Sequence, residues 1–184
     1  STTMSDDFND NSIDGAKWSA GSGITETGGQ IDITHNASSQ LVTANFYSLY
    51  DKRITVEIVS SPTASASVAT QLSVSSDAFA GARYILFDIY NGNIRFNQGG
   101  SGAAGGLTIP YNAAVHKFFR LSFHAGGITY QTSTDGITFK THRILPVYEG
   151  LESQKIYLSQ YNASGSNKTS IFDNFLLEDL SNLY

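Results

Sequence analysis

The stretch that decides the fold is YILFDIYNGNIRFN, which runs from Tyr84 to Asn97. Apolar and other residues alternate along it, and a period of two is typical of a β-strand with one buried face. The dipeptide Asn91-Gly92 separates the two alternating runs, and it tolerates the positive φ angles of a tight type I′ turn. The stretch therefore predicts an antiparallel hairpin made of Tyr84–Tyr90 and Asn93–Asn97.

The same alternation continues on both sides of this hairpin, and no long stretch has helical periodicity. Turn signals separate the alternating segments at intervals typical of an antiparallel sandwich or barrel. The other expected strands are Gln30–Thr34, Leu41–Phe46, Arg53–Val59, Val68–Val74, Phe118–His124, Ile128–Ser133, Ile156–Tyr161 and Thr169–Leu177. The sequence thus predicts an all-β protein, folded as a two-sheet antiparallel β-sandwich.

Alternation also assigns two faces to each expected strand, because successive side chains of a strand point to opposite sides. Side chains of one parity are apolar and form the expected inter-sheet core: Ile85, Phe87, Ile89, Phe119, Leu121, Phe123, Ile156 and Leu158. Side chains of the other parity form an outer surface of aromatic and polar groups. Any binding site on the strands is expected on that surface.

Composition excludes several classes of partner. The chain has 184 residues, of which 40% are hydrophobic and 15% charged, so we expect one folded domain spanning residues 1–184. A formal net charge of −5 provides no basic field for nucleic acid, and no apolar run is long enough to insert into a membrane. The absence of cysteine excludes disulfides and thiolate metal sites.

Two features concern the wider context of the domain. Residues 98–106 are rich in glycine and predict a flexible loop inside it. The chain starts at Ser1 rather than Met, which indicates a processed product or a domain excised from a longer protein, and we favour the excised domain. Its composition suits a larger microbial or phage protein. A cysteine-free surface rich in serine, threonine and asparagine favours an extracellular or virion-associated location.

Three short motifs carry a resemblance to a known family. The chain begins with D-D-F-N-D at Asp6–Asp10, followed by Lys17-Trp18; it has S-T-D-G-I-T-F at Ser133–Phe139 and I-F-D-N-F at Ile171–Phe175. This combination resembles the concanavalin A-like lectin/glucanase superfamily, specifically its laminin-G-like jelly rolls. The resemblance implies a jelly roll in which the opening and closing strands pair and one concave sheet faces carbohydrate.

The resemblance also implies a structural calcium ion where the first and last strands meet. The matching residues are Asp7 and Asp173, and calcium prefers such carboxylate oxygens together with carbonyl oxygens. The alternative is that Asp7 caps a turn and that Asp173 accepts hydrogen bonds from backbone amides. A chelator-sensitive melting temperature distinguishes the two.

The glucanase branch of the superfamily carries its acid and nucleophile on an E-x-D-x-x-E strand, and this chain has no such triplet. We therefore expect it not to be an enzyme. Glycoside hydrolysis needs two carboxylates that face each other across a cleft. Glu57 and Asp88 are the strand-borne candidates, and a glycoside hydrolase with such an atypical acid/base pair remains an alternative.

Sugars present apolar C–H faces and polar rims, so aromatic rings flanked by polar groups suit them. The expected ligand-binding residues are Gln71, Asp88, Tyr90, Arg95, Tyr157, Tyr161 and Asn162. The sequence thus predicts a non-catalytic carbohydrate-binding or attachment domain. Its expected partners are glycans or cell-surface polysaccharide, and other domains of the virion or parent protein. A structural virion module of the head decoration or tail, acting through protein contacts, is the alternative.

Overall fold

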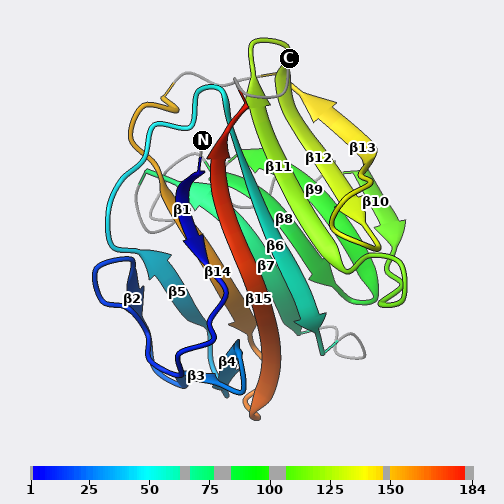
Figure 1. The fold of residues 1–184 in the computed structure, drawn as a ribbon. Helices are drawn as coiled ribbons and strands as arrows, with labels where there is room; N and C mark the ends of the chain where they lie inside the picture. Colours follow the sequence, from blue (N-terminus) through cyan, green and yellow to red (C-terminus); the bar gives the residue numbers. More distant parts are fainter. Residues whose placement is uncertain (1, 63–66, 77–83, 100–106, 147–149, 181–184) are drawn as a thin grey trace.

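The computed structural model describes residues 2–62, 67–76, 84–99, 107–146 and 150–180. Within these ranges the chain forms fifteen β-strands in two antiparallel sheets, and it forms no helix. Accordingly, none of the described residues belongs to a helix long and apolar enough to cross a membrane. Figure 1 shows one sheet lying in front of the other. The prediction of an all-β, two-sheet sandwich is confirmed.

Sheet A has eight strands in the order β13-β12-β11-β6-β15-β4-β3, with β1 paired to β15 outside this path. Its strands are β1 (Thr2–Asp6), β3 (Ile24–Thr27), β4 (Gln30–His35), β6 (Lys52–Ser60), β11 (Phe118–His124), β12 (Gly127–Ser133), β13 (Lys140–Leu145) and β15 (Lys168–Asp179). The last strand of the chain, β15, therefore lies in the middle of this sheet, between β6 and β4.

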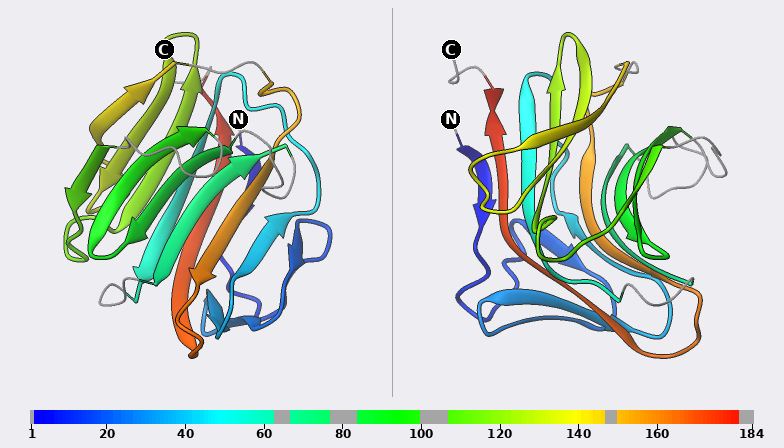
Figure 2. Two further views of the ribbon diagram at one scale, coloured as in Figure 1. Left: turned by 180° about the vertical axis from the view of Figure 1, so that it is seen from behind. Right: turned by 90° about the vertical axis from the view of Figure 1, so that its right-hand side faces the viewer.

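Sheet B has seven strands in the order β10-β9-β8-β7-β14-β5-β2. Its strands are β2 (Trp18–Ala20), β5 (Ser39–Thr43), β7 (Val68–Ser75), β8 (Tyr84–Tyr90), β9 (Asn93–Gly99), β10 (Leu107–Pro110) and β14 (Lys155–Asn162). Seen edge-on, the strands of sheet B curve so that the side turned away from sheet A is concave (Figure 2).

The hairpin that opened the sequence argument forms as predicted. Strands β8 and β9 pair from Tyr84 opposite Gly99 to Tyr90 opposite Asn93. The turn residues Asn91 and Gly92 have φ angles of 49° and 71°, both in the left-handed region that a type I′ turn requires. This turn fixes the register, and the register decides which side chains share a face.

Other boundaries differ from the prediction. Strand β5 ends at Thr43 rather than Phe46, and beyond it the chain bends so that the Thr43 hydroxyl donates to the Asn45 carbonyl at 3.0 Å. Residues 98 and 99 extend β9 instead of belonging to the glycine-rich loop, whose remaining residues, 100–106, lie outside the described residues. The alternation pattern also missed five short or marginal strands: β1, β2, β3, β10 and β13.

The core lies between the two sheets and contains every side chain that alternation assigned to it. Phe87 of sheet B stacks on Phe119 of sheet A with their ring centroids 4.0 Å apart and their planes 8° from parallel. Both rings are fully buried. Contacts of this kind hold the two sheets in a fixed relation, because interdigitated side chains leave little room for sliding.

The opening and closing motifs meet where β1 pairs with β15 in sheet A. Strands β1 and β15 pair, with Asp6 opposite Phe175, which confirms the expected pairing of the two ends. Trp18, which is 2% exposed, packs edge-on against Phe175 at a centroid distance of 4.9 Å. Its Nε1 donates to Asp6 Oδ2 at 2.9 Å. These motif residues are therefore structural, and they join distant parts of the chain.

Candidate functional site

The concave outer face of sheet B gathers polar side chains into one row across four strands. The register sets Arg95 of β9 opposite Asp88 of β8, and Asp88 opposite Gln71 of β7. Ser159 of β14 lies opposite Gln71 and continues the row. Because these residues share one parity, all four side chains point to the same side of the sheet.

Hydrogen bonds join this row into one network. Arg95 donates from Nε to Asp88 Oδ1 at 2.9 Å and from Nη2 to Asp88 Oδ2 at 2.5 Å, which is a two-point contact. Gln71 Nε2 donates to the same Oδ2 at 3.1 Å, and Ser159 Oγ donates to Gln71 Oε1 at 3.4 Å. Each side chain is thereby oriented by its neighbours across the strands.

The centre of the network is an electrically balanced pair. Burial lowers the pKa of Arg95, but the hydrogen bond and negative charge of Asp88 outweigh it, so the pKa is raised overall. The Asp88 side chain is 0% exposed, whereas that of Arg95 is 28% exposed. A ligand on this face therefore meets the edge of the Arg95 guanidinium rather than the Asp88 carboxylate.

Two tyrosines lie in the adjacent row of the same face. The guanidinium carbon of Arg95 lies 4.2 Å from the centroid of the Tyr90 ring. Tyr90 and Tyr161 each pair with Ala69, so the small alanine side chain separates the two rings across the sheet. Neighbouring strands are about 4.8 Å apart, which puts the two tyrosine positions roughly 10 Å apart. Tyr161 is 44% exposed and Tyr90 half-buried.

Six of the seven predicted ligand-binding residues thus share one face, but three of the seven do not offer a ligand surface, the first being the fully buried Asp88. Tyr157 lies on this face and is only 2% exposed, so its ring is not available as a platform. Asn162 has the opposite parity, is 5% exposed, and its Nδ2 donates to the carbonyls of His35 and Ser166. The structure therefore does not bring Asn162 to the outer face of sheet B.

Sequence reasoning missed Ser159, although it assigned this residue to the outer surface. Ser159 and Gln71 are 88 positions apart in the sequence, and only the register between β14 and β7 makes them neighbours. The sequence contains no signal for that register. Alternation assigns the face of a residue, but only strand order shows which residues of that face are neighbours.

The proposed acid/base pair of Glu57 and Asp88 is wrong. Glu57 lies on the outer face of sheet A, where its Oε2 accepts a hydrogen bond from Asn174 Nδ2 at 2.7 Å. Asp88 lies on the outer face of sheet B, so the core of the sandwich separates the two carboxylates. Among the described residues, Asp88 is the one carboxylate borne by a strand of sheet B.

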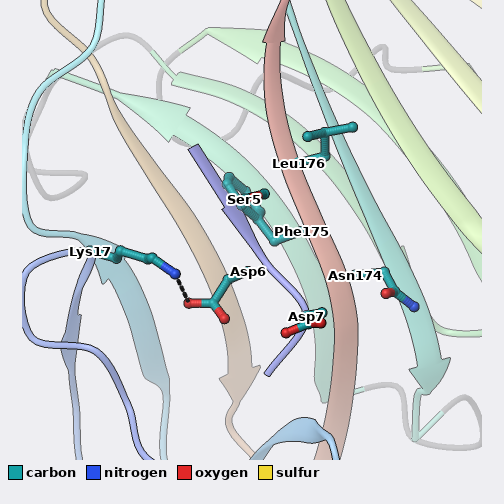
Figure 3. Close-up of a pocket in the computed structure, with 7 residues that line it drawn as sticks. All are labelled: Ser5, Asp6, Asp7, Lys17, Asn174, Phe175 and Leu176. Atoms are coloured by element: carbon teal, nitrogen blue, oxygen red, sulfur yellow. Dashed lines mark hydrogen bonds and ion pairs between the residues drawn. The ribbon is translucent and has the colours of Figure 1, made fainter. Parts of the chain in front are cut away.

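The two predicted calcium ligands lie near the paired ends of the chain, beside a pocket of about 430 Å³. Figure 3 shows Asp7 at this pocket, with the Lys17 ammonium 3.4 Å from Asp6 Oδ2. The pocket is lined by Ser5, Asp6, Asp7, Lys17, Asn174, Phe175 and Leu176. A lysine at the pocket makes part of it unfavourable for a cation.

Asp7 and Asp173 interact electrostatically, but each carboxylate also accepts a hydrogen bond from a residue close to it in the sequence. Burial raises the pKa of Asp173, and the charges of Glu57 and Asp7 raise it further, while Asn174 N donates to its Oδ1 at 2.6 Å. A side-chain hydrogen bond from Asn9 lowers the pKa of Asp7. Within the described ranges, no group of three or more His, Cys, Asp or Glu side chains could hold a metal.

Comparisons with known proteins were made by sequence and by structure. No protein-family model matches the sequence, and no curated protein matches it either. Solved structures do match. LamAcat of Zobellia galactanivorans superposes with a TM-score of 0.71 at 10% identity, covering 97% of this chain and 98% of the other.

The chain has the jelly-roll fold of β-glucanases. The β-glucanase of Bacillus licheniformis matches with a TM-score of 0.62 at 10% identity, covering 96% of each chain. Rv0315 of Mycobacterium tuberculosis, described as an immunostimulatory antigen and pseudo β-1,3-glucanase, matches with a TM-score of 0.67 at 9% identity, covering 97% and 98%. Another structure of LamA holds laminaritriose and laminaritetraose. The expected resemblance to concanavalin A-like jelly rolls is confirmed.

These neighbours contradict the prediction that the chain is not an enzyme. That prediction rested on the absence of one carboxylate triplet, whereas the jelly roll found here matches 96% of the β-glucanase of Bacillus licheniformis and 95% of the endo-1,3-β-glucanase of Streptomyces sioyaensis. A pseudo-glucanase has the same fold. The absence of the triplet was therefore no sufficient ground for excluding enzymatic activity.

Proposed function

We propose that this protein acts on glycans and that the concave outer face of sheet B binds a polysaccharide chain. The observation that carries the proposal is the continuous network of Arg95, Asp88, Gln71 and Ser159 beside the rings of Tyr90 and Tyr161. Oriented polar groups next to exposed aromatic rings match the polar rims and apolar faces of sugars. The neighbour that holds laminarin oligosaccharides supports a β-glucan as the first ligand to test.

The polar groups of this face have defined hydrogen-bonding roles. The Arg95 guanidinium donates, and its exposed edge offers further N–H groups to sugar hydroxyls. Cleavage between two carboxylates needs a second carboxyl group about 5–9.5 Å from the first. Since Asp88 is the one carboxylate on the described strands of sheet B, such a partner would come from a loop.

The first test measures binding of laminarin and of mixed-linkage β-glucan by calorimetry. Tyr161→Ala and Tyr90→Ala are each expected to weaken binding by about two- to tenfold, because an aromatic contact contributes roughly 0.5–1.5 kcal/mol beyond its buried area. Tyr50→Ala removes another exposed tyrosine, which belongs to the loop that precedes β6, and serves as the matched control.

Unchanged affinity in both tyrosine variants would reject this face as the binding site. Absence of binding to any glycan on an array would instead favour the structural virion module that acts through protein contacts. Reducing-sugar release is measured in the same samples to show whether binding leads to cleavage. The microbial or phage origin and the extracellular or virion-associated location stay predictions.

We also retain the proposal of a structural calcium ion at Asp7 and Asp173. Calcium takes six to eight oxygens, so backbone carbonyls and water would complete the two carboxylates. Chelation is expected to lower the melting temperature by roughly 5 °C, and added calcium is expected to restore it, because a ligand that binds only the folded state stabilises it.

The calcium proposal has a matched pair of variants. Asp173→Asn is expected to abolish the chelation effect, whereas Asp51→Asn removes one equal charge at a turn where φ is 51° and should leave the effect intact. Identical melting curves with chelator and with calcium would show that Asp7 and Asp173 only accept hydrogen bonds from nearby residues and bind no calcium.

A further inference from the structure

The S-T-D-G-I-T-F motif, the second of the three in the sequence, builds a turn at the outer face of sheet A, away from the proposed glycan site. Asp135 Oδ1 accepts hydrogen bonds from the amides of Ile137 and Thr138 at 2.9 and 2.8 Å. These amides and the Ser133 hydroxyl lower the pKa of Asp135 to about 2. The carboxylate therefore remains charged at ordinary pH and keeps the turn closed.

Phe139 follows this turn, and its ring packs against Arg120 of strand β11. The guanidinium carbon of Arg120 lies 3.4 Å from the centroid of the Phe139 ring, and Arg120 Nε donates to Thr55 Oγ1 at 2.9 Å. These two contacts fix the plane and direction of the guanidinium. A planar cation that is held in advance binds an oxyanion at less cost in entropy than a freely rotating one.

Arg120 has no paired carboxylate among the described residues, whereas the nearby Arg53 has one. Arg53 is paired with Glu178 through a 2.6 Å contact, whereas no carboxylate of the described residues lies within ion-pair distance of Arg120. Burial and the positive charge of Arg53 together lower the pKa of Arg120 to about 10, although the negative charge of Glu178 acts in the opposite direction. Burial and a neighbouring cation both disfavour the charged form of Arg120, so a bound anion would stabilise it.

The surroundings of Arg120 combine cationic, aromatic and hydroxyl groups. Phe118 lies two positions earlier on the same face of β11, and Phe139 is half-buried. Gln131 of β12 pairs with Arg120, and its Nε2 donates to Thr141 Oγ1 at 3.1 Å. Rings beside hydrogen-bonding groups suit sugars, and a guanidinium adds recognition of an acidic substituent.

We propose that the outer face of sheet A carries an anion-binding site, centred on Arg120 and Phe139, for the carboxylate or sulfate groups of an acidic polysaccharide. This site is separate from the one proposed on sheet B, since the core lies between the two faces. A protein with both sites would hold glycan on opposite sides of the sandwich. The two sites can be inactivated independently.

The test compares dextran sulfate, polygalacturonate and neutral dextran as ligands in calorimetry at fixed ionic strength. The intact protein is expected to bind the two acidic polymers and not dextran. Arg120→Gln is expected to weaken that binding by about tenfold or more, because a hydrogen bond to a charged group contributes roughly 1.5–3 kcal/mol. Arg120→Lys should weaken it nearly as much, since an ammonium lacks the planar fork that stacks on Phe139.

Lys168→Gln removes one positive charge at the start of β15, opposite His35, and is the control. It is expected to change affinity less than twofold, as is usual for a remote surface charge. Equal losses in Lys168→Gln and Arg120→Gln would overturn the proposal in favour of diffuse attraction. Tighter binding of poly-L-glutamate than of either acidic polysaccharide would overturn the assignment to a glycan.

The same measurements separate this proposal from the one on sheet B. If Tyr161→Ala abolishes binding of the acidic polymers and Arg120→Gln leaves it intact, the site at Arg120 is rejected while the sheet B site stands. If laminarin fails to bind but dextran sulfate binds through Arg120, the proposal for sheet B fails and the one for sheet A stands. Circular dichroism melting curves of each variant exclude loss of the fold as the cause.

Discussion

Asp88→Ala is expected to lower the free energy of unfolding by about 3 kcal/mol, because it leaves the Arg95 charge without its partner. The Asp88 carboxylate is completely buried and accepts hydrogen bonds from both Arg95 and Gln71, so both donors lose their acceptor together. Arg95 remains partly open to water, which keeps the loss at the lower end of the range for buried ion pairs. Fluorescence of the single tryptophan reports the melting transition.

The companion variant replaces both members of the pair by apolar residues, as Asp88→Leu with Arg95→Met. It is expected to recover most of the stability, because removing both charges leaves no unpaired group behind. Glycan binding should nevertheless stay weak, since the guanidinium is gone. A double variant as unstable as the sum of the two single variants would show that Arg95 and Asp88 do not act as a pair.

Trp18→Ala is expected to cost about 3–5 kcal/mol, the usual range for deleting a large buried aromatic ring. The ring lies between Phe8 and Phe175, so its loss leaves a cavity where the two ends of the chain meet. The melting temperature should fall by roughly 10 °C, measured by circular dichroism because the variant lacks tryptophan. Proteolysis should then begin in the segment that precedes β2.

Trp18→Phe is the matched control for this prediction. It keeps most of the ring volume and loses only the hydrogen bond from Nε1 to Asp6 Oδ2, which contributes about 1 kcal/mol. Asp6 retains its hydrogen bond from the Phe8 amide and its contact with Lys17. Equal destabilisation by the alanine and phenylalanine substitutions would mean that the hydrogen bond, rather than packing, holds the ends together.

Alternation and turn chemistry predicted the fold well where a strand is long and has one buried face. Strand β8 has the predicted bounds, and Ile85, Phe87 and Ile89 lie in the inter-sheet core as predicted, although Leu86 and Asp88 on its other face are buried as well. Strand β13 escaped notice because its residues alternate in neither hydrophobicity nor burial, as is usual for a strand at the edge of a sheet. Residues 140–145 are extended because they pair with β12, and their own sequence pattern does not predict a strand.

The candidate site was predictable in its residue types but not in its connections. Asp88 and Arg95 face each other across a short hairpin, so the turn alone specifies their pairing. Tyr157 was predicted to be a platform because parity put it outside, and parity does not reveal that the residue is 2% exposed. The stacking of Phe139 on Arg120 depends on a turn whose closure is set by Asp135, and alternation contains no information about it.

The central position of β15 has a consequence for how the protein is made. Every strand of sheet B emerges from the ribosome before β15 does, but sheet A then still consists of three separate parts, β13-β12-β11-β6, β4-β3 and β1. Until β15 emerges, β6 and β4 expose unpaired backbone edges of the kind that pair with other chains. A nascent chain that stalls before residue 168 should therefore depend on chaperones, and its aggregation would begin at these two edges.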